Sequence, residues 1–174
     1  ERLYDEYERA SREWTPLQFS IADQISGKIN FATKSLHSII YRTRPDVNAI
    51  VHVHADHTVA WSLLRKPFLF TTQESSLFYN DIAQVELAEL ITNDNADLIA
   101  QNFASVNTLI MNNHGAITLG ANLESAIWRT ILLDKICKLN LLASSAGLPH
   151  EIDTVTLEKN HKFFALPKTM TYQY

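Results

Sequence analysis

The sequence predicts one α/β domain in which helices pack on a sheet that is not purely parallel. Three observations favour this class. Strand-like segments alternate with segments whose apolar residues have helical spacing, which is typical of α/β folds. The segment Thr108–Leu119 resembles two short strands joined by a tight turn, which adds an antiparallel pair. A length of 174 residues suits one domain, 1–174, because no linker divides the chain.

In the amino-terminal half, elements are predicted from apolar spacing and from turn residues. Helical spacing predicts helices at Glu1–Trp14, Ser35–Arg42 and Thr58–Leu64. Alternation and β-forming residues predict strands at Leu17–Ile21, Asn48–His54 and Phe68–Thr72. Turns are expected at Ser26-Gly27-Lys28 and Pro45-Asp46, and a polar loop through Ser76. His52 and His54 therefore lie at the carboxyl end of a predicted strand.

In the carboxyl-terminal half the same reasoning predicts four helices and two strands. Helices are expected at Val85–Ile91, Ala96–Phe103, Asn122–Gly147 and Thr156–Leu166, with Asn122 as the cap of the longest. Thr108–Met111 is a buried strand, Asn112–Gly115 a turn and Ala116–Leu119 the return strand. Residues 167–174 form a tail.

Composition excludes some classes of partner. The formal charge is -4 and no Lys/Arg cluster occurs, so nucleic acid is not an expected partner. No apolar run reaches the roughly 20 residues of a membrane span, so no membrane partner is expected either. Cys137 is the single cysteine, which excludes an intrachain disulfide and suits a reducing compartment. The expected location is the cytoplasm.

Three histidines form a candidate metal site. His52 and His54 are two residues apart on a strand, so both side chains point to the same face. Such a pair alone is often a polar strand edge, and His114 is the natural third ligand because it lies in a turn where Gly115 lets the backbone bend. Three neutral imidazoles with an open position are typical of catalytic zinc, while Mn²⁺, Fe²⁺ or Co²⁺ could also bind.

Other residues near these motifs have two interpretations. Asp56 and Asn113 either orient the imidazoles or serve as a helix cap and a turn residue. His37 is either part of the core or adjacent to the site. His57 either faces the cavity or, as favoured, occupies a surface position on a helix, and surface positions are expected for His150 and His161.

The combined motifs resemble those of the class II aldolase and adducin head-domain family. They are Arg44–His54, Asn113-His114-Gly115 and the helix ending in Leu141–Gly147, and the match covers Phe31 to Gly147. The resemblance implies a three-layer α/β/α sandwich around a mainly antiparallel, mixed sheet, with His52, His54 and His114 as metal ligands. It also implies a homo-oligomer, with a tetramer favoured. Because typical members are longer, the chain is expected to lack part of the usual amino-terminal region, unless a loop is omitted from the sequence.

The sequence also departs from the family pattern. Aldolases of this family carry an acid/base glutamate four residues before the position of His37, and Thr33 stands there. The family's Gly-Asn-Ser phosphate-binding segment has no match. The segments Leu36–Tyr41 and Thr72–Ala83 are more similar to the adducin-like branch, which includes bacterial proteins of unassigned activity and cytoskeletal adducins.

These features predict a metal-dependent lyase that acts on a small oxygenated carbonyl substrate. Aldol cleavage and decarboxylation both pass through an enediolate that a metal ion stabilises. Glu74 or Tyr79 is the candidate proton donor, unless they serve only as a helix cap and a packing aromatic. Tyr172 and Tyr174 are candidates to reach a neighbouring subunit's site. The alternatives are a non-catalytic adducin-like binding or assembly module and a truncated, inactive aldolase paralogue.

Overall fold

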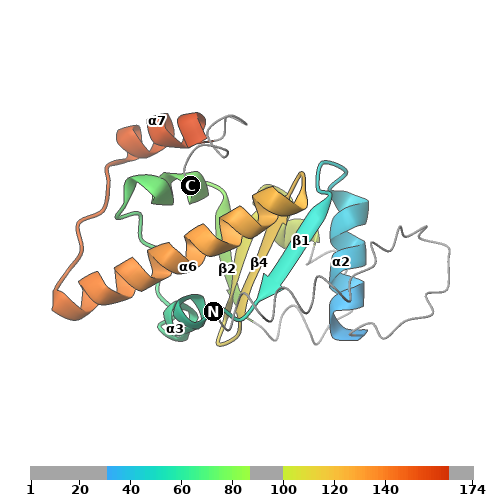
Figure 1. Cartoon of the computed structure of the whole chain (residues 1–174), viewed down its shortest axis with the longest axis horizontal. Coiled ribbons are helices and arrows are strands. Elements are labelled where there is room, and N and C mark those ends of the chain that lie inside the picture. The colour runs from blue at the N-terminus through green and yellow to red at the C-terminus, as the bar shows by residue number, and fades with distance from the viewer. Residues whose placement is uncertain (1–30, 87–99, 165–174) are drawn as a thin grey trace.

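The computed structural model describes residues 31–86 and 100–164 of the chain (Figure 1). In these ranges the elements are α2 (Phe31–Thr43), β1 (Ala49–Val53), α3 (Asp56–Leu63), the 3₁₀ helix η1 (Gln73–Phe78), β2 (Ile82–Glu86), β3 (Thr108–Asn112), β4 (Gly115–Gly120), α6 (Leu123–Ala146) and α7 (Thr154–Phe164). The elements and turn predicted within residues 1–28, and the tail, lie outside the described residues.

The sheet has four strands in the order β1-β4-β3-β2. β4 runs antiparallel to both of its neighbours, and β2 runs parallel to β3. The prediction of a mixed, mainly antiparallel sheet is therefore confirmed. This topology places the carboxyl ends of β1, β2 and β3 at one edge of the sheet, together with the turn between β3 and β4.

Helices cover both faces of this sheet. Alternate residues of β3 point to opposite faces: Leu109 packs with Leu36 and Ile40 of α2, whereas Ile110 packs with Trp61 of α3 and Leu132 of α6. Figure 1 shows α2 on one side of the strands and α6 crossing the other. The predicted three-layer α/β/α sandwich is confirmed.

The segments with the strongest local signals form the expected elements. Asn122 caps α6, since its side-chain oxygen accepts a hydrogen bond of 2.8 Å from the Ser125 N–H. A buried hydroxyl pair fixes this helix to the sheet, because Thr130 Oγ1 lies 2.6 Å from Thr118 Oγ1 of β4. The predicted strand Asn48–His54 forms as β1.

Two predicted elements are wrong. Phe68–Thr72 does not join the sheet: Phe70 N–H donates to Glu151, and the Phe70 carbonyl accepts from Ile152 N–H. The helix expected at Val85–Ile91 is wrong where the structure describes it, because Val85 and Glu86 end strand β2. Pairing with β3 overrides the local preference there. Residues 87–99 lie outside the described part, and residues 100–102 are helical as expected. The expected polar loop contains η1.

A cluster of buried charged residues lies at the opposite edge of the sheet, where β2 and β3 begin. Arg129 of α6 forms an ion pair of 2.6 Å with Asp81, and both side chains are 12% exposed. The other oxygen of Asp81 accepts from the backbone N–H of Asn107 at 2.6 Å, and Arg44 donates to the Asn107 side chain at 2.7 Å. These contacts connect α6 and the end of α2 to the segments that enter β2 and β3.

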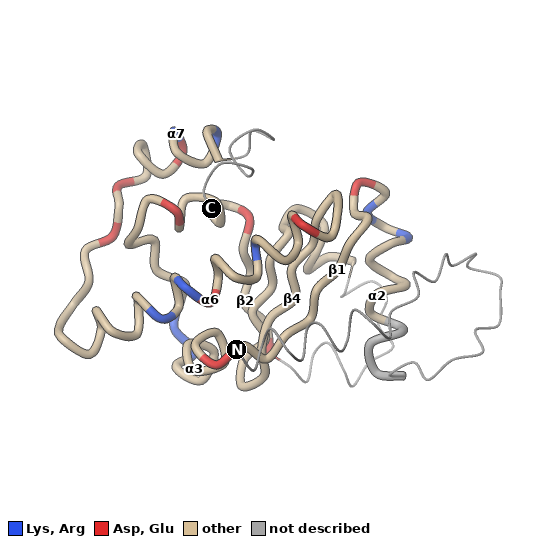
Figure 2. The backbone as a smooth tube through the Cα atoms, in the orientation of Figure 1, with Lys and Arg blue, Asp and Glu red and all other residues tan. Residues whose placement is uncertain are grey.

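Charged residues of the described part are spread over many elements, as Figure 2 shows. Among the described residues, no helix is both long and apolar enough to cross a membrane.

Candidate metal centre

His52 and His54 occupy the carboxyl end of β1. His52 pairs with Ile117 of β4, and Ile117 belongs to the apolar cluster beneath α2. Residues directly opposite each other in an antiparallel pair share a face, so His52 points toward the α2 layer. His54 follows the last residue of the strand and is more exposed than His52. The backbone ladder thus fixes the first histidine, and the segment after the strand must fix the second.

His114 lies in the tight turn between β3 and β4. The turn closes with a hydrogen bond of 3.1 Å from His114 N–H to the Met111 carbonyl. Asn113 has a φ of 61°, a left-handed conformation that asparagine tolerates better than most residues. The residue that absorbs the sharp bend is therefore Asn113.

Gly115 is required for a different reason from the one the sequence suggested. Its φ is not positive, so the expectation that it provides the bend is wrong. Instead, a Cβ built on Gly115 would overlap the Val53 carbonyl oxygen and would lie 2.8 Å from Cδ2 of the His54 ring. The absent side chain lets β4 lie close to the end of β1, which places His114 beside His54.

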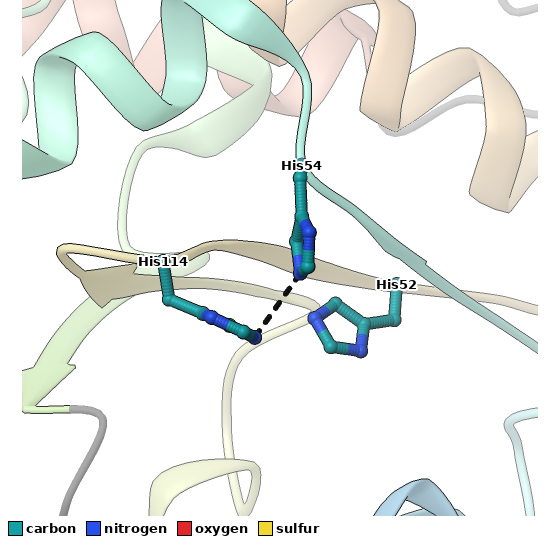
Figure 3. A group of neighbouring side chains, drawn as sticks. All are labelled: His52, His54 and His114. Atoms are coloured by element: carbon teal, nitrogen blue, oxygen red, sulfur yellow. Dashed lines mark hydrogen bonds between the residues drawn. The ribbon is translucent and has the colours of Figure 1, made fainter. Parts of the chain in front are cut away.

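The three imidazoles converge on one point. Each ring offers a nitrogen, and these atoms all lie within 4.8 Å of one another. His54 Nε2 lies 3.1 Å from His114 Nε2, and Figure 3 shows the three rings turned toward each other. Two nitrogens bound to one zinc ion at about 2.0–2.1 Å with tetrahedral geometry lie roughly 3.3 Å apart. The observed spacing suits a shared ion, as well as a hydrogen bond between two neutral rings.

Burial and neighbouring rings keep His52 and His114 in the form that binds metal. Burial and the neighbouring imidazoles His114 and His54 lower the pKa of His52 to about 4. Burial, and then His54, also lower the pKa of His114. At neutral pH His52 and His114 are therefore uncharged with a free lone pair, which is the state required of a ligand. His52 Nε2 is buried and has no hydrogen-bond partner among the described residues. This is expected of a nitrogen that faces a metal ion.

Comparison with known proteins identifies the family. The family model of the class II aldolase and adducin N-terminal domain matches residues 12–141. The chain belongs to this family. Decarboxylase NovR of Streptomyces niveus is 32% identical over 135 residues, which are 75% of this chain and 50% of that protein. Gamma-adducin of Rattus norvegicus is 30% identical over 139 residues, which are 78% of this chain and 20% of that protein.

A solved class II aldolase has the same fold. The L-fuculose 1-phosphate aldolase from Glaciozyma antarctica PI12 matches with a TM-score of 0.72 and 34% identity, over 82% of this chain and 54% of that one. The chain thus spans about half the length of the decarboxylase and of this aldolase.

At the position of the family's acid/base glutamate, Thr33 lies on α2, one helical turn before His37. His37 is half-buried, and it is close enough to be one of the causes that lower the pKa of His52, so the site-adjacent alternative fits it. Burial lowers the pKa of His37 itself. Its Nε2 is buried without a hydrogen-bond partner in the part of the chain that is described. His37 therefore adds a neutral polar group to the α2 side of the centre.

The structure does not bring Glu74 or Tyr79 to the three histidines. Both lie in or beside η1, ahead of β2, whereas the histidines lie at the edge where β2 and β3 end. Glu74 pairs with Lys135 of α6 at 3.3 Å, and Tyr79 packs edge-on against Phe70. Their role as proton donors stays a prediction. Tyr172 and Tyr174 lie outside the described residues.

Several neighbours of the motifs serve structural contacts. The Asn113 side-chain oxygen accepts two hydrogen bonds from Arg65, at 3.0 and 3.2 Å, so it holds the turn by this contact.

His57 is not a plain surface residue, because its Nδ1 lies 2.8 Å from Asp134 of α6. His161 is half-buried, and its Nδ1 lies 3.0 Å from the Ser76 carbonyl, contrary to expectation. His150 is exposed as expected. Sequence reasoning missed Arg65 and Asp134, because no local pattern marks contacts between distant segments.

Proposed function

We propose that His52, His54 and His114 bind one divalent metal ion, with zinc the first candidate and Mn²⁺, Fe²⁺ or Co²⁺ the alternatives. The observation that carries the proposal is the convergence of three ring nitrogens, within 4.8 Å, from two stretches about sixty residues apart. Three nitrogen ligands leave a coordination position open for a substrate, as in catalytic sites.

We further propose that the protein is a carbon–carbon lyase acting on a small oxygenated carbonyl substrate by aldol cleavage or decarboxylation. A bound divalent ion would polarise the substrate carbonyl and offset negative charge that develops on its oxygen. The pairing of β1 with β4 holds the backbone of His52, and the closed turn holds the backbone of His114. Relatives named as a decarboxylase and as fuculose phosphate aldolases support this reaction class.

Proton transfer in this chemistry needs a donor other than the family's glutamate, because Thr33 stands at that position. Glu74 and Tyr79 stay proposed donors, and they are tested by Glu74→Gln and Tyr79→Phe. A donor role predicts a large loss of kcat with metal content unchanged; activity equal to that of the unmodified protein would remove both from the mechanism. Thr33→Glu is the complementary test, since an aldolase that has lost only its carboxylate should gain cleavage of sugar phosphates.

The second candidate is an adducin-like binding or assembly module, or an inactive aldolase paralogue, in which the metal has no catalytic role. Thr33 and the similarity to gamma-adducin favour it. A broad screen for release of pyruvate, aldehyde or carbon dioxide separates the candidates. Product formed by the loaded protein supports the lyase, and silence across the screen supports the module.

Metal analysis of protein purified without an affinity tag is the primary experiment. About one equivalent of metal is expected in the unmodified protein and almost none in His52→Ala or His114→Ala. His150→Ala is the matched control, since it removes an exposed histidine away from the centre. Equal metal content in all four proteins would refute the centre.

The oligomeric state and the cellular location stay expectations. Light scattering tests the expected homo-oligomer, with a tetramer first, and cell fractionation tests the expected cytoplasmic location.

A further inference from the structure

We propose that Asp134 of α6 is a positioning residue for the metal centre, which holds His54 by capping helix α3. The inference rests on the proposed metal site, and it concerns how the chain fixes His54, the ligand that follows strand β1. His54 follows the last residue of β1, and α3 begins two residues later at Asp56. Only Ala55 separates the ligand from the helix.

Helix α3 lacks a cap of its own. The first N–H groups of a helix have no partner within the helix and are usually satisfied by a side chain at the N-cap position. That position is Ala55, whose side chain has no acceptor. An eight-residue helix without a cap is marginal by itself, so its first turn depends on a contact from elsewhere.

Asp134 supplies that contact from the neighbouring helix. Its Oδ1 accepts from the backbone N–H of Thr58 at 2.9 Å and from the Thr58 hydroxyl at 3.1 Å. Its Oδ2 lies 2.8 Å from Nδ1 of His57. One carboxylate thus binds two consecutive residues in the first turn of α3. Its negative charge also lies at the helix end where the backbone dipole favours an anion.

The contact from Asp134 should affect the position of His54 and not that of His52. His52 is held by the hydrogen-bonded ladder between β1 and β4, in register with Ile117. The direction of the chain at His54 is set on one side by the end of β1 and on the other by the first turn of α3. Releasing that turn should therefore let His54 move from its place 3.1 Å from His114.

The test compares Asp134→Ala with Thr130→Val, a matched control on the same helix. Thr130 fixes α6 to β4 through its hydroxyl, which hydrogen-bonds with Thr118 and with the Ala126 carbonyl. Neither partner belongs to α3 or to the metal centre. Zinc affinity is measured by competition with a chromophoric chelator, and the stability of the metal-free protein by urea unfolding. Both variants are expected to be less stable. Only Asp134→Ala should bind zinc about 10- to 100-fold more weakly, the usual effect of losing a group that orients a ligand. An affinity loss in Asp134→Ala less than tenfold larger than that in Thr130→Val overturns the inference.

Asp134→Asn keeps the result interpretable if Asp134→Ala folds poorly. The amide oxygen of asparagine can still accept from Thr58 N–H, so this variant should retain more of the zinc affinity than Asp134→Ala does. Equal affinities in two folded variants would overturn the capping role.

In metal-free protein, nuclear magnetic resonance of the His54 ring provides a readout independent of metal loading. The ring signal should shift in Asp134→Ala and not in Thr130→Val. An unchanged His54 signal defeats this inference, whereas an unmodified protein that binds no metal defeats the proposed function.

Discussion

Replacing Gly115 with alanine should damage the metal centre more than it damages the fold. Gly115 is the first residue of β4 and directly follows His114. An added Cβ would overlap the Val53 carbonyl oxygen and lie 2.8 Å from Cδ2 of His54, whereas ordinary contacts begin at 3.4 Å. Both obstacles belong to the segment that carries the other ligands, so relief of the overlap must separate β4 from the end of β1.

The size of this displacement decides the outcome. Relief of the ring contact alone requires a shift of at least 0.6 Å, the difference between 3.4 and 2.8 Å. Metal and catalytic sites tolerate errors of only about 0.5 Å. Overpacking of this kind typically costs about 1–3 kcal/mol of stability. We expect a comparable loss here, together with a roughly tenfold or greater loss of zinc affinity, in line with other changes that misplace a ligand.

Gly120→Ala is the matched control, at the other end of the same strand. A Cβ there would overlap the Ser125 hydroxyl and lie 2.6 Å from the Ala126 backbone nitrogen, so the crowding is similar but remote from the histidines. Urea unfolding of the metal-free proteins and zinc competition are the assays. Both variants should lose stability, and only Gly115→Ala should lose affinity. Normal affinity in Gly115→Ala, or an equal loss in both variants, would refute the proposed close approach of β4 to His54.

Three further predictions concern charge and burial. The folded state lowers the pKa of His52 to about 4, so protons bind the unfolded state more readily than the folded state. The metal-free protein should therefore lose stability as pH falls below about 6.5. Urea titrations at pH 7 and 5 should show a smaller loss for His52→Gln. Burial raises the pKa of Cys137 to about 12, so Ellman's reagent at pH 8 should react only after unfolding. Arg129→Met leaves the Asp81 carboxylate buried and unpaired, and denaturant unfolding should show a loss of about 3–5 kcal/mol, partly recovered by adding Asp81→Asn.

The fold was readable from the sequence where local patterns and packing agree. The cap at Asn122 and the apolar spacing after it predict α6, and alternation around Val51 predicts β1. Strand β2 was missed because its partner β3 lies more than twenty residues further along the chain. The segment Phe68–Thr72 resembles a strand, yet its hydrogen bonds go to the loop at Glu151 and Ile152.

The sequence alone determined which residues make up the candidate centre, because strand periodicity places His52 and His54 on one side and the Asn-His-Gly motif marks a turn at His114. Only the tertiary structure decided how these residues are held. The close approach that requires Gly115 and the cap that Asp134 gives to α3 join segments separated by roughly sixty to eighty residues. Such contacts depend on how the sheet and helices pack, and no local pattern encodes them.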